Sequence, residues 1–439
     1  MLYAFIKIMM RVAVNFYYKR IYSNGIENIP EKDAAIIIAN HPSSLMDAAI
    51  IGILTKRPIY FFARGDIFIN RPVRLILKHL HMIPVYHHQQ GRNTTNHNDE
   101  SFERAKQILE KKGLIVFFPE GSSHTDRKLN PLKKGVFRMA FQALSSPGFK
   151  GDLWIVPAGI NYSHPTASQS MVMVNISAPV LLNQFFSSYQ TNPTATFRSC
   201  AQYFYSILIQ QVLHVEDDQR QLPANQLLEM KRNNILQQKN INLFKIEKKC
   251  CDDLNRLHEN SIDELGKKIN EYFGALQVHS VTDKIISVRT SNIESKKIFL
   301  AIVSPMMVVG YMLNMPPILL AKKIVDKKVN RQDFYSWIYV VSSSLLFIVW
   351  MLTMGVAVLS FSGWKWMAGF LIFTITTGLL SHAGMIWLRE ILADNKWKKI
   401  QRKNLLTANS LKESRKEILQ TWEILKHEPD YNFILPHSR

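Results

Sequence analysis

A histidine and an aspartate capable of general-base chemistry stand six residues apart near the start of the chain. His41 follows an apolar run, residues 34–39, that reads as a buried parallel strand, and Asp47 begins the helical pattern that comes next. Pro42 favours an extended backbone at His41, which places the imidazole at the end of the strand. A nearby carboxylate fixes the tautomer of such a histidine and stabilises its imidazolium form. The alternative interpretation is a turn histidine beside an aspartate that caps a helix.

A second polar segment follows another predicted strand, residues 114–118. It reads Pro119-Glu120-Gly121-Ser122-Ser123-His124. The proline and the glycine are typical of a tight turn, and the backbone N–H groups that such a turn exposes suit a phosphate group. An ordinary turn between a strand and a loop is the alternative. A third segment, residues 156–162, also ends a predicted strand but indicates little by itself.

The elements that must position these residues alternate between short β-rich runs and helical stretches over residues 30–180. That alternation is typical of an α/β domain, in which ligands bind at the carboxyl ends of parallel strands. The further predicted strands are residues 59–63, 82–86 and 153–158, and the predicted helices are residues 47–54, 71–79, 100–111 and 135–144. The polar residues 89–99 are predicted to form a loop. Residues 185–290 have helical apolar spacing and no chemical motif.

Three apolar segments follow residue 297. Residues 338–359 and 366–387 contain no Asp, Glu, Lys or Arg, and about 20 apolar residues suffice to span a bilayer. Residues 298–321 carry three prolines, so this segment is predicted to be re-entrant or interfacial. Basic clusters at both of its ends and after the last span are all cytoplasmic under the positive-inside rule if only two segments cross. The sequence therefore predicts an integral membrane protein with its α/β domain on the cytoplasmic face.

The N-terminal residues 1–24 carry a polar stripe at every fourth position, Lys7, Arg11, Asn15 and Lys19, in an otherwise apolar helical pattern. An amphipathic helix in a membrane interface has this pattern, and a surface helix packed on its own domain is the alternative. The expected organisation is an interfacial helix (1–24), a catalytic domain (25–184), a helical extension (185–296), a membrane region (297–389) and a basic cytoplasmic tail (390–439).

The formal net charge of +20 indicates an anionic partner. Because the basic residues flank apolar segments and are not interleaved with aromatic residues, we expect a bilayer with anionic lipids rather than a nucleic acid. The three cysteines, Cys200, Cys250 and Cys251, show neither metal-ligand spacing nor a disulfide framework. Five histidines between residues 79 and 97 match no known metal-binding spacing, so no metal site is expected.

Taken together and in this order, the segments from about Gly25 to Pro179 resemble the glycerol-phosphate and lysophospholipid acyltransferase superfamily. The resemblance is carried by the lead-in at residues 25–30, the segment with His41 and Asp47, the turn after residue 118, and residues 131–135 and 156–165. The superfamily usually places its aspartate five residues after its histidine. The six-residue gap, the pair Ser123-His124 and the C-terminal membrane segments are similar to its membrane-bound glycerol-3-phosphate and dihydroxyacetone-phosphate acyltransferase branch.

The resemblance implies an acyltransferase-type mixed sheet flanked by helices. It also implies an O-acyltransferase that moves a fatty acyl group from an acyl thioester, acyl-CoA or acyl carrier protein, to the hydroxyl group of glycerol-3-phosphate or dihydroxyacetone phosphate in phospholipid biosynthesis. No cofactor is implied. His41 and Asp47 take the catalytic roles. The residues assigned to acceptor binding are Glu120, Gly121, Ser122, Arg64, His87 and Lys133.

One position departs from the superfamily pattern: the second motif, residues 83–87, ends in His87 where an arginine is usual. A neutral imidazole is a weaker phosphate partner than a guanidinium group. The basic residues that can supply the charge are Arg64, Lys133, Lys134 and Arg92.

Two alternative functions stay open. One is a 1-acylglycerol-3-phosphate or other lysophospholipid acyltransferase, which has the same chemistry with a different acceptor. The other is a non-catalytic membrane scaffold that binds lipid. No GxSxG, GxxxxGK or GxGxxG motif points to another class of enzyme. The sequence does not indicate an oligomeric state.

Overall fold

The computed structural model describes residues 2–68, 70–85, 94–235, 241–287 and 293–427. The chain divides into two compact units. The first comprises Met1–His214 and Val329–Val340, and the second comprises Val215–Lys328 and Val341–Arg439. Residues 185–214, which were expected in the helical extension, thus belong to the first unit.

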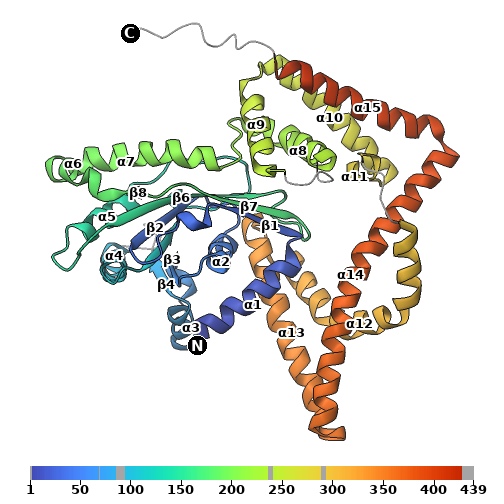
Figure 1. Ribbon diagram of the computed structural model, residues 1–439, viewed down its shortest axis with the longest axis horizontal. Coiled ribbons are helices and arrows are strands. Elements are labelled where there is room, and N and C mark those ends of the chain that lie inside the picture. Colours follow the sequence, from blue (N-terminus) through green and yellow to red (C-terminus); the bar gives the residue numbers. More distant parts are fainter. Residues whose placement is uncertain (1, 69, 86–93, 236–240, 288–292, 428–439) are drawn as a thin grey trace. The chain divides into compact units, whose positions relative to one another are not determined.

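The first unit is built on a mixed sheet with the strand order β1-β7-β6-β2-β5-β3-β4, in which β8 also pairs with β6 (Figure 1). The strands are β1 (Arg20–Asn24), β2 (Ala34–Ala39), β3 (Ile59–Arg64), β4 (Met82–Val85), β5 (Leu114–Phe117), β6 (Leu153–Tyr162), β7 (Met171–Ile176) and β8 (Val180–Leu181). All pairs are parallel except those of β6 with β7 and β8. The mixed α/β fold predicted from the sequence is therefore confirmed.

Helices cover both faces of this sheet, and successive residues of the fully buried strand β2 point to opposite faces. Ile36 and Ile38 pack against α4, α5 and α7, whereas Ile37 packs against α1 and α2. The helices of this unit are α1 (Leu2–Tyr17), α2 (Leu45–Leu54), α3 (Arg71–His79), α4 (Thr94–Glu110), α5 (Gly135–Leu144), α6 (Phe186–Thr191) and α7 (Pro193–Leu208), with short 3₁₀ turns at Ile26–Asn28, Gly65–Ile67, Leu182–Phe185 and Ile209–Gln211.

Helix α1 turns part of its polar stripe toward the protein, while several of its large apolar side chains face outward. Lys7 donates to the carbonyl of Thr55 and Arg11 to the carbonyl of Ile53, each across 2.5 Å, so both cations cap the C-terminal end of α2. Phe5 and Ile8 are 60% and 61% exposed. A helix that exposes large apolar side chains while its cations bind its own domain presents an apolar surface outward.

The second unit contains a helical part and three long apolar helices. The helical part consists of a 3₁₀ turn at Asp218–Arg220, α8 (Gln221–Ile235), α9 (Leu243–Arg256), α10 (Glu259–His279), α11 (Asp283–Ser287) and α15 (Leu405–Leu425). Buried Asp283 holds these helices together because its Oδ1 accepts from Arg415 Nε across 2.7 Å and from the Tyr272 hydroxyl across 2.9 Å. Helix α15 falls within the expected C-terminal tail, so part of that tail is folded.

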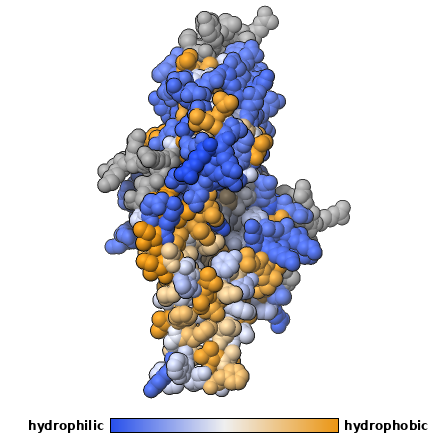
Figure 2. Space-filling model, turned by 90° about the vertical axis from the view of Figure 1, so that its right-hand side faces the viewer, coloured by the Kyte–Doolittle hydropathy of each residue, from blue (hydrophilic) through white to orange (hydrophobic). Residues whose placement is uncertain are grey.

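The long helices are α12 (Ile293–Lys328), α13 (Gln332–Ser362) and α14 (Trp364–Lys403), and each is long and apolar enough to cross a membrane. Figure 2 shows hydrophobic side chains gathered on their surface. The prolines of α12 do not end it: the helix is continuous, and its ribbon bends along its length (Figure 1). Gly310 of α12 lies so close to the Thr377 carbonyl and the Ser381 side chain of α14 that a larger residue would collide.

Candidate active site

His41 lies at the carboxyl end of β2, in the middle of the sheet between β5 and β6. The buried residue before it, Asn40, clamps this end of the strand to β6. Its Nδ2 donates to the carbonyl of Ile160 across 2.9 Å, and its Oδ1 accepts from the N–H of Ile160 across 2.7 Å. These two hydrogen bonds fix the point at which the chain leaves the sheet. That point lies at the carboxyl edge of the parallel strands, where α/β domains bind their ligands.

The structure brings His41 and Asp47 together. His41 Nδ1 lies 2.9 Å from Oδ2 of Asp47, whose side chain is fully buried. The same oxygen accepts from the N–H of Ser43 across 2.8 Å, and the other oxygen, Oδ1, accepts from the hydroxyl of Tyr162 across 2.6 Å. Burial raises the pKa of Asp47, and the hydrogen bonds from His41, Tyr162 and Ser43 lower it.

This arrangement suits a general base. With its Nδ1–H directed at Asp47, the imidazole keeps Nε2 as the acceptor of a substrate proton. The side chain of His41 is 18% exposed, and its ring stacks on Phe118 with the centroids 3.9 Å apart. The histidine is therefore fixed on one side by a carboxylate and on one face by an aromatic ring.

Glu120 anchors the two turns to each other. Its Oε1 accepts from the backbone N–H of His41 across 2.9 Å, and its Oε2 accepts from the N–H of Asn130 across 2.8 Å and lies 2.9 Å from His124 Nε2. The residue is only 3% exposed. The sequence assigned Glu120 to acceptor binding, but these contacts give its carboxylate a positioning role.

Basic groups gather around the turn that follows β5. Gly121 has a φ of 77°, which favours glycine, and a side chain there would collide with the ammonium end of Lys133. The hydrogen bond from His124 to Glu120 raises the pKa of His124, so its imidazolium form is favoured. The N–H of His124 donates to the carbonyl of His41 across 3.1 Å. Ser122 is exposed on the same turn.

Two predicted acceptor residues remain, Arg64 and His87. Arg64 ends β3, whose parallel register with β5 pairs Phe61 with Val116, so it lies at the same edge of the sheet as the turn. Its guanidinium group pairs with Asp66, with Nε 3.2 Å from Oδ1, and it is half exposed. His87 lies outside the described residues.

Two site residues were missed by the sequence analysis. Tyr162 stands in the third segment, but nothing in its spacing indicated that it bonds to Asp47. Asp333, in the first turn of α13, accepts a hydrogen bond from the hydroxyl of Ser123. An acidic residue at the start of an apolar helix was the only signal for this contact.

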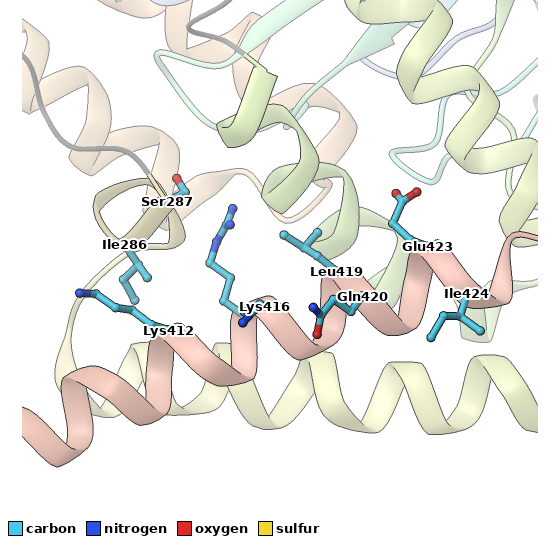
Figure 3. A pocket seen from close by; sticks show the side chains of 9 residues that line it. Ile286, Ser287, Lys412, Lys416, Leu419, Gln420, Glu423 and Ile424 are labelled. Atoms are coloured by element: carbon cyan, nitrogen blue, oxygen red, sulfur yellow. The ribbon is translucent and has the colours of Figure 1, made fainter.

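The described residues contain no group of three His, Cys, Asp or Glu side chains that could hold a metal ion. Figure 3 shows an open hollow of the second unit, lined among others by Ile286, Lys412, Lys416 and Glu423. It includes none of the predicted site residues.

Comparison with known proteins identifies relatives of this domain. Residues 20–161 match the sequence model of the Acyltransferase family. The chain is 32% identical over 101 residues to glycerol-3-phosphate O-acyltransferase 2 of Saccharomyces cerevisiae, covering 23% of this chain and 13% of that protein. It is 25% identical over 255 residues to glycerol-3-phosphate O-acyltransferase 1 of the same yeast, covering 52% and 31%. The chain thus matches less than a third of the length of these two relatives.

Two further similarities are to 1-acylglycerol-3-phosphate acyltransferases. A chloroplastic 1-acyl-sn-glycerol-3-phosphate acyltransferase of Arabidopsis thaliana is 25% identical over 135 residues, covering 30% of this chain and 36% of that protein. The crystal structure of a 1-acyl-sn-glycerophosphate acyltransferase from Thermotoga maritima aligns with a TM-score of 0.34 and 20% identity, over 47% of this chain and 79% of the other.

Proposed function

We propose, from the premise that residues 20–161 form a domain of the acyltransferase family, that this chain is a membrane-bound glycerol-phosphate acyltransferase. It moves a fatty acyl group from an acyl thioester to a hydroxyl group of glycerol-3-phosphate or dihydroxyacetone phosphate. The observation that carries the proposal is the buried Asp47 carboxylate 2.9 Å from His41 Nδ1, beside a turn ringed by basic groups.

The reaction needs one base and no covalent enzyme intermediate. His41 Nε2 takes the proton of the acceptor hydroxyl as its oxygen attacks the thioester carbonyl. Asp47 stabilises the imidazolium that forms. The tetrahedral intermediate collapses by breaking the carbon–sulfur bond, and the imidazolium returns its proton to the leaving thiolate. Neither a cofactor nor a metal ion takes part, and acyl-CoA or an acylated carrier protein serves as donor.

The basic turn supports an acceptor that carries phosphate. Lys133 lies against Gly121, and the protonated form of His124 is favoured by Glu120. His124 belongs to the turn and donates its N–H to the carbonyl of His41, and Lys133 donates its N–H to the carbonyl of Pro119 in the same turn. A base for a hydroxyl group and cations for a phosphate are the two functions that a glycerol-phosphate acceptor requires. Lysophosphatidate carries the same phosphate, so it is the competing acceptor.

The contacts of the helices support a topology with two crossings. Among the described residues before 288, no helix is long and apolar enough to span, so the proposed topology has no crossing before α12. The first turns of α13 belong to the first unit. Helix α15 packs on α10, with Lys268 3.0 Å from Glu417. Helix α12 therefore starts and ends on the same face of the membrane, and α13 and α14 cross.

The shared face is the cytoplasmic one. Basic residues are concentrated at both ends of α12 and at the end of α14, and the positive-inside rule places such clusters in the cytoplasm. The exposed apolar side of α1 enters the same leaflet, whose anionic lipids attract the basic residues.

The test is acyl transfer by the purified full chain in detergent, with long-chain acyl-CoA or acylated carrier protein as donor and a panel of acceptors. We expect glycerol-3-phosphate or dihydroxyacetone phosphate to be acylated and His41→Ala to be inactive. His258→Ala, a change at an exposed histidine of the second unit, is the matched control and should keep full activity. Acylation of lysophosphatidate alone would mean that lysophosphatidate, and not a glycerol phosphate, is the acceptor. No transfer from either donor class by folded protein would favour the lipid-binding scaffold.

A further inference from the structure

The first turns of the apolar helix α13 are part of the acyltransferase unit. Ser336 is fully buried, donates to the carbonyl of Pro165 across 2.6 Å, and lies 2.9 Å from the hydroxyl of Tyr17. Val340 is buried in the same core as the side chains of α1 and α2. These contacts fix the start of α13 against the domain that contains His41.

This docking brings an arginine to the basic turn. Buried Asp333 accepts from the hydroxyl of Ser123, and Arg331 Nε lies 3.1 Å from its Oδ1. A second guanidinium nitrogen of Arg331 lies 2.6 Å from Oδ2. A carboxylate that holds two nitrogens of the fork fixes the plane of the guanidinium group. The side chain of Arg331 is nevertheless 53% exposed, so it is oriented by Asp333 and accessible from solvent.

Three basic side chains then lie on or next to one short turn, residues 119–124. Lys133 lies against Gly121, His124 is bonded to Glu120, and Arg331 reaches Ser123 through Asp333. This turn also places Phe118 against the ring of His41. A phosphate held by these groups would therefore lie at the turn that also carries a contact to the base.

We propose that Arg331 binds the phosphate group of the acyl acceptor and so replaces the arginine whose position is taken by His87. The proposal rests on the proposed function, and it holds for glycerol phosphates and for lysophosphatidate because both carry the phosphate. It also gives the start of α13 a second role: the residue that precedes this helix completes the acceptor site. A merely structural role is the alternative, in which Arg331 neutralises Asp333.

The first experiment compares the full-length wild type with Arg331→Gln at saturating acyl-CoA. We expect KM for glycerol-3-phosphate to rise about 10- to 100-fold, because a charge-assisted contact to the phosphate is lost, while KM for acyl-CoA is unchanged. Arg198→Gln removes an exposed arginine of α7 and serves as the matched control. An unchanged acceptor KM in Arg331→Gln overturns the proposal.

A double variant separates ligand binding from support of the fold. Arg331→Gln leaves the buried Asp333 carboxylate without its cation, which can loosen the start of α13. Arg331→Gln/Asp333→Asn removes both charges and keeps an acceptor for Ser123. We expect the double variant to regain the thermal stability of the wild type but to keep the raised KM. Recovery of the wild-type KM would mean that Arg331 only neutralises Asp333, and the proposal would be wrong.

Binding of inorganic phosphate, measured by calorimetry, keeps this inference distinct from the proposed function. Phosphate should bind Arg331→Gln about 10- to 100-fold more weakly than it binds the wild type. If the wild type acylates no glycerol phosphate but shows this difference, the proposed function fails and the phosphate site stands. If the wild type is active and phosphate binding is equal in both proteins, only the phosphate site fails.

Discussion

Tyr162 donates its hydroxyl hydrogen bond to Oδ1 of Asp47, across 2.6 Å, while His41 faces the opposite oxygen, Oδ2. Each carboxylate oxygen thus has its own donor, which fixes the plane of the carboxylate relative to the imidazole. Burial raises the pKa of Tyr162 well above its usual range, so the phenol remains a donor at any working pH. Tyr162 is therefore a positioning residue that acts on His41 through Asp47.

Tyr162→Phe should lower kcat about tenfold, because the buried Asp47 carboxylate loses a hydrogen bond and orients the imidazole of His41 less well. KM values for both substrates should stay unchanged, since Tyr162 lies behind Asp47 and touches neither substrate. Steady-state kinetics of the purified protein measure both parameters. Tyr203→Phe, at an exposed tyrosine of α7, is the control and should leave kcat unchanged. A raised acceptor KM at constant kcat would contradict the positioning role.

His124 should make acceptor binding weaken as the pH rises. Its hydrogen bond with Glu120 raises its pKa above 6.5, so the imidazolium persists below the raised value and is lost as the pH passes through it. The second ionisation of a phosphate monoester, near pH 6, is nearly complete by about pH 7. KM for glycerol-3-phosphate measured from about pH 7 to 9 should therefore rise through loss of the imidazolium.

His124→Gln keeps a donor for Glu120 but removes the titrating cation. In this variant the acceptor KM should already be high at about pH 7, and its rise toward about pH 9 should be absent. His258→Gln, at an exposed histidine, should retain the wild-type profile. An identical pH profile in His124→Gln would show that another group titrates.

The parts of the site that the sequence predicts are those encoded locally. His41 and Asp47 are six residues apart on either side of a strand end, so strand and helix periodicity alone bring them to one edge of the sheet. Tyr162 is 115 residues from Asp47, and Asp333 is 210 residues from Ser123. Their contacts depend on strand order and on where α13 docks, which no local pattern encodes.

Helix α1 shows a second limit of the sequence. Periodicity predicts that Lys7 and Arg11 share a face, but it does not say what that face meets. In the structure, that face contacts the carbonyls of Ile53 and Thr55 at the C-terminal end of α2. Large apolar side chains such as Phe5 are exposed. A helix whose cations point into water would show the same sequence pattern.

The exposed side of α1 should lie among acyl chains. A fluorophore on Phe5→Cys should be quenched by brominated lipid chains in proteoliposomes, because Phe5 is 60% exposed on the apolar side. The same fluorophore on Tyr203→Cys should not be quenched, because α7 covers the opposite face of the sheet from α1. Equal quenching at both positions would argue against α1 as the membrane-facing helix.

The two-crossing topology predicts which connections share a side of the membrane. Single cysteines at Lys297, near the start of α12, and at Asn330, just after its end, flank the apolar part of that helix, and one at Ser362 lies at the end of α13, next to the turn into α14. In sealed vesicles, a membrane-impermeant maleimide should label Lys297→Cys and Asn330→Cys from one side and Ser362→Cys from the other. The three native cysteines are buried and should give little background.

Labelling of Lys297→Cys and Asn330→Cys from opposite sides would mean that α12 crosses. The chain after α14 would then emerge opposite the helices that precede α12. That arrangement is incompatible with the ion pair between Arg415 and Asp283, so the contacts of α15 would have to be wrong as well.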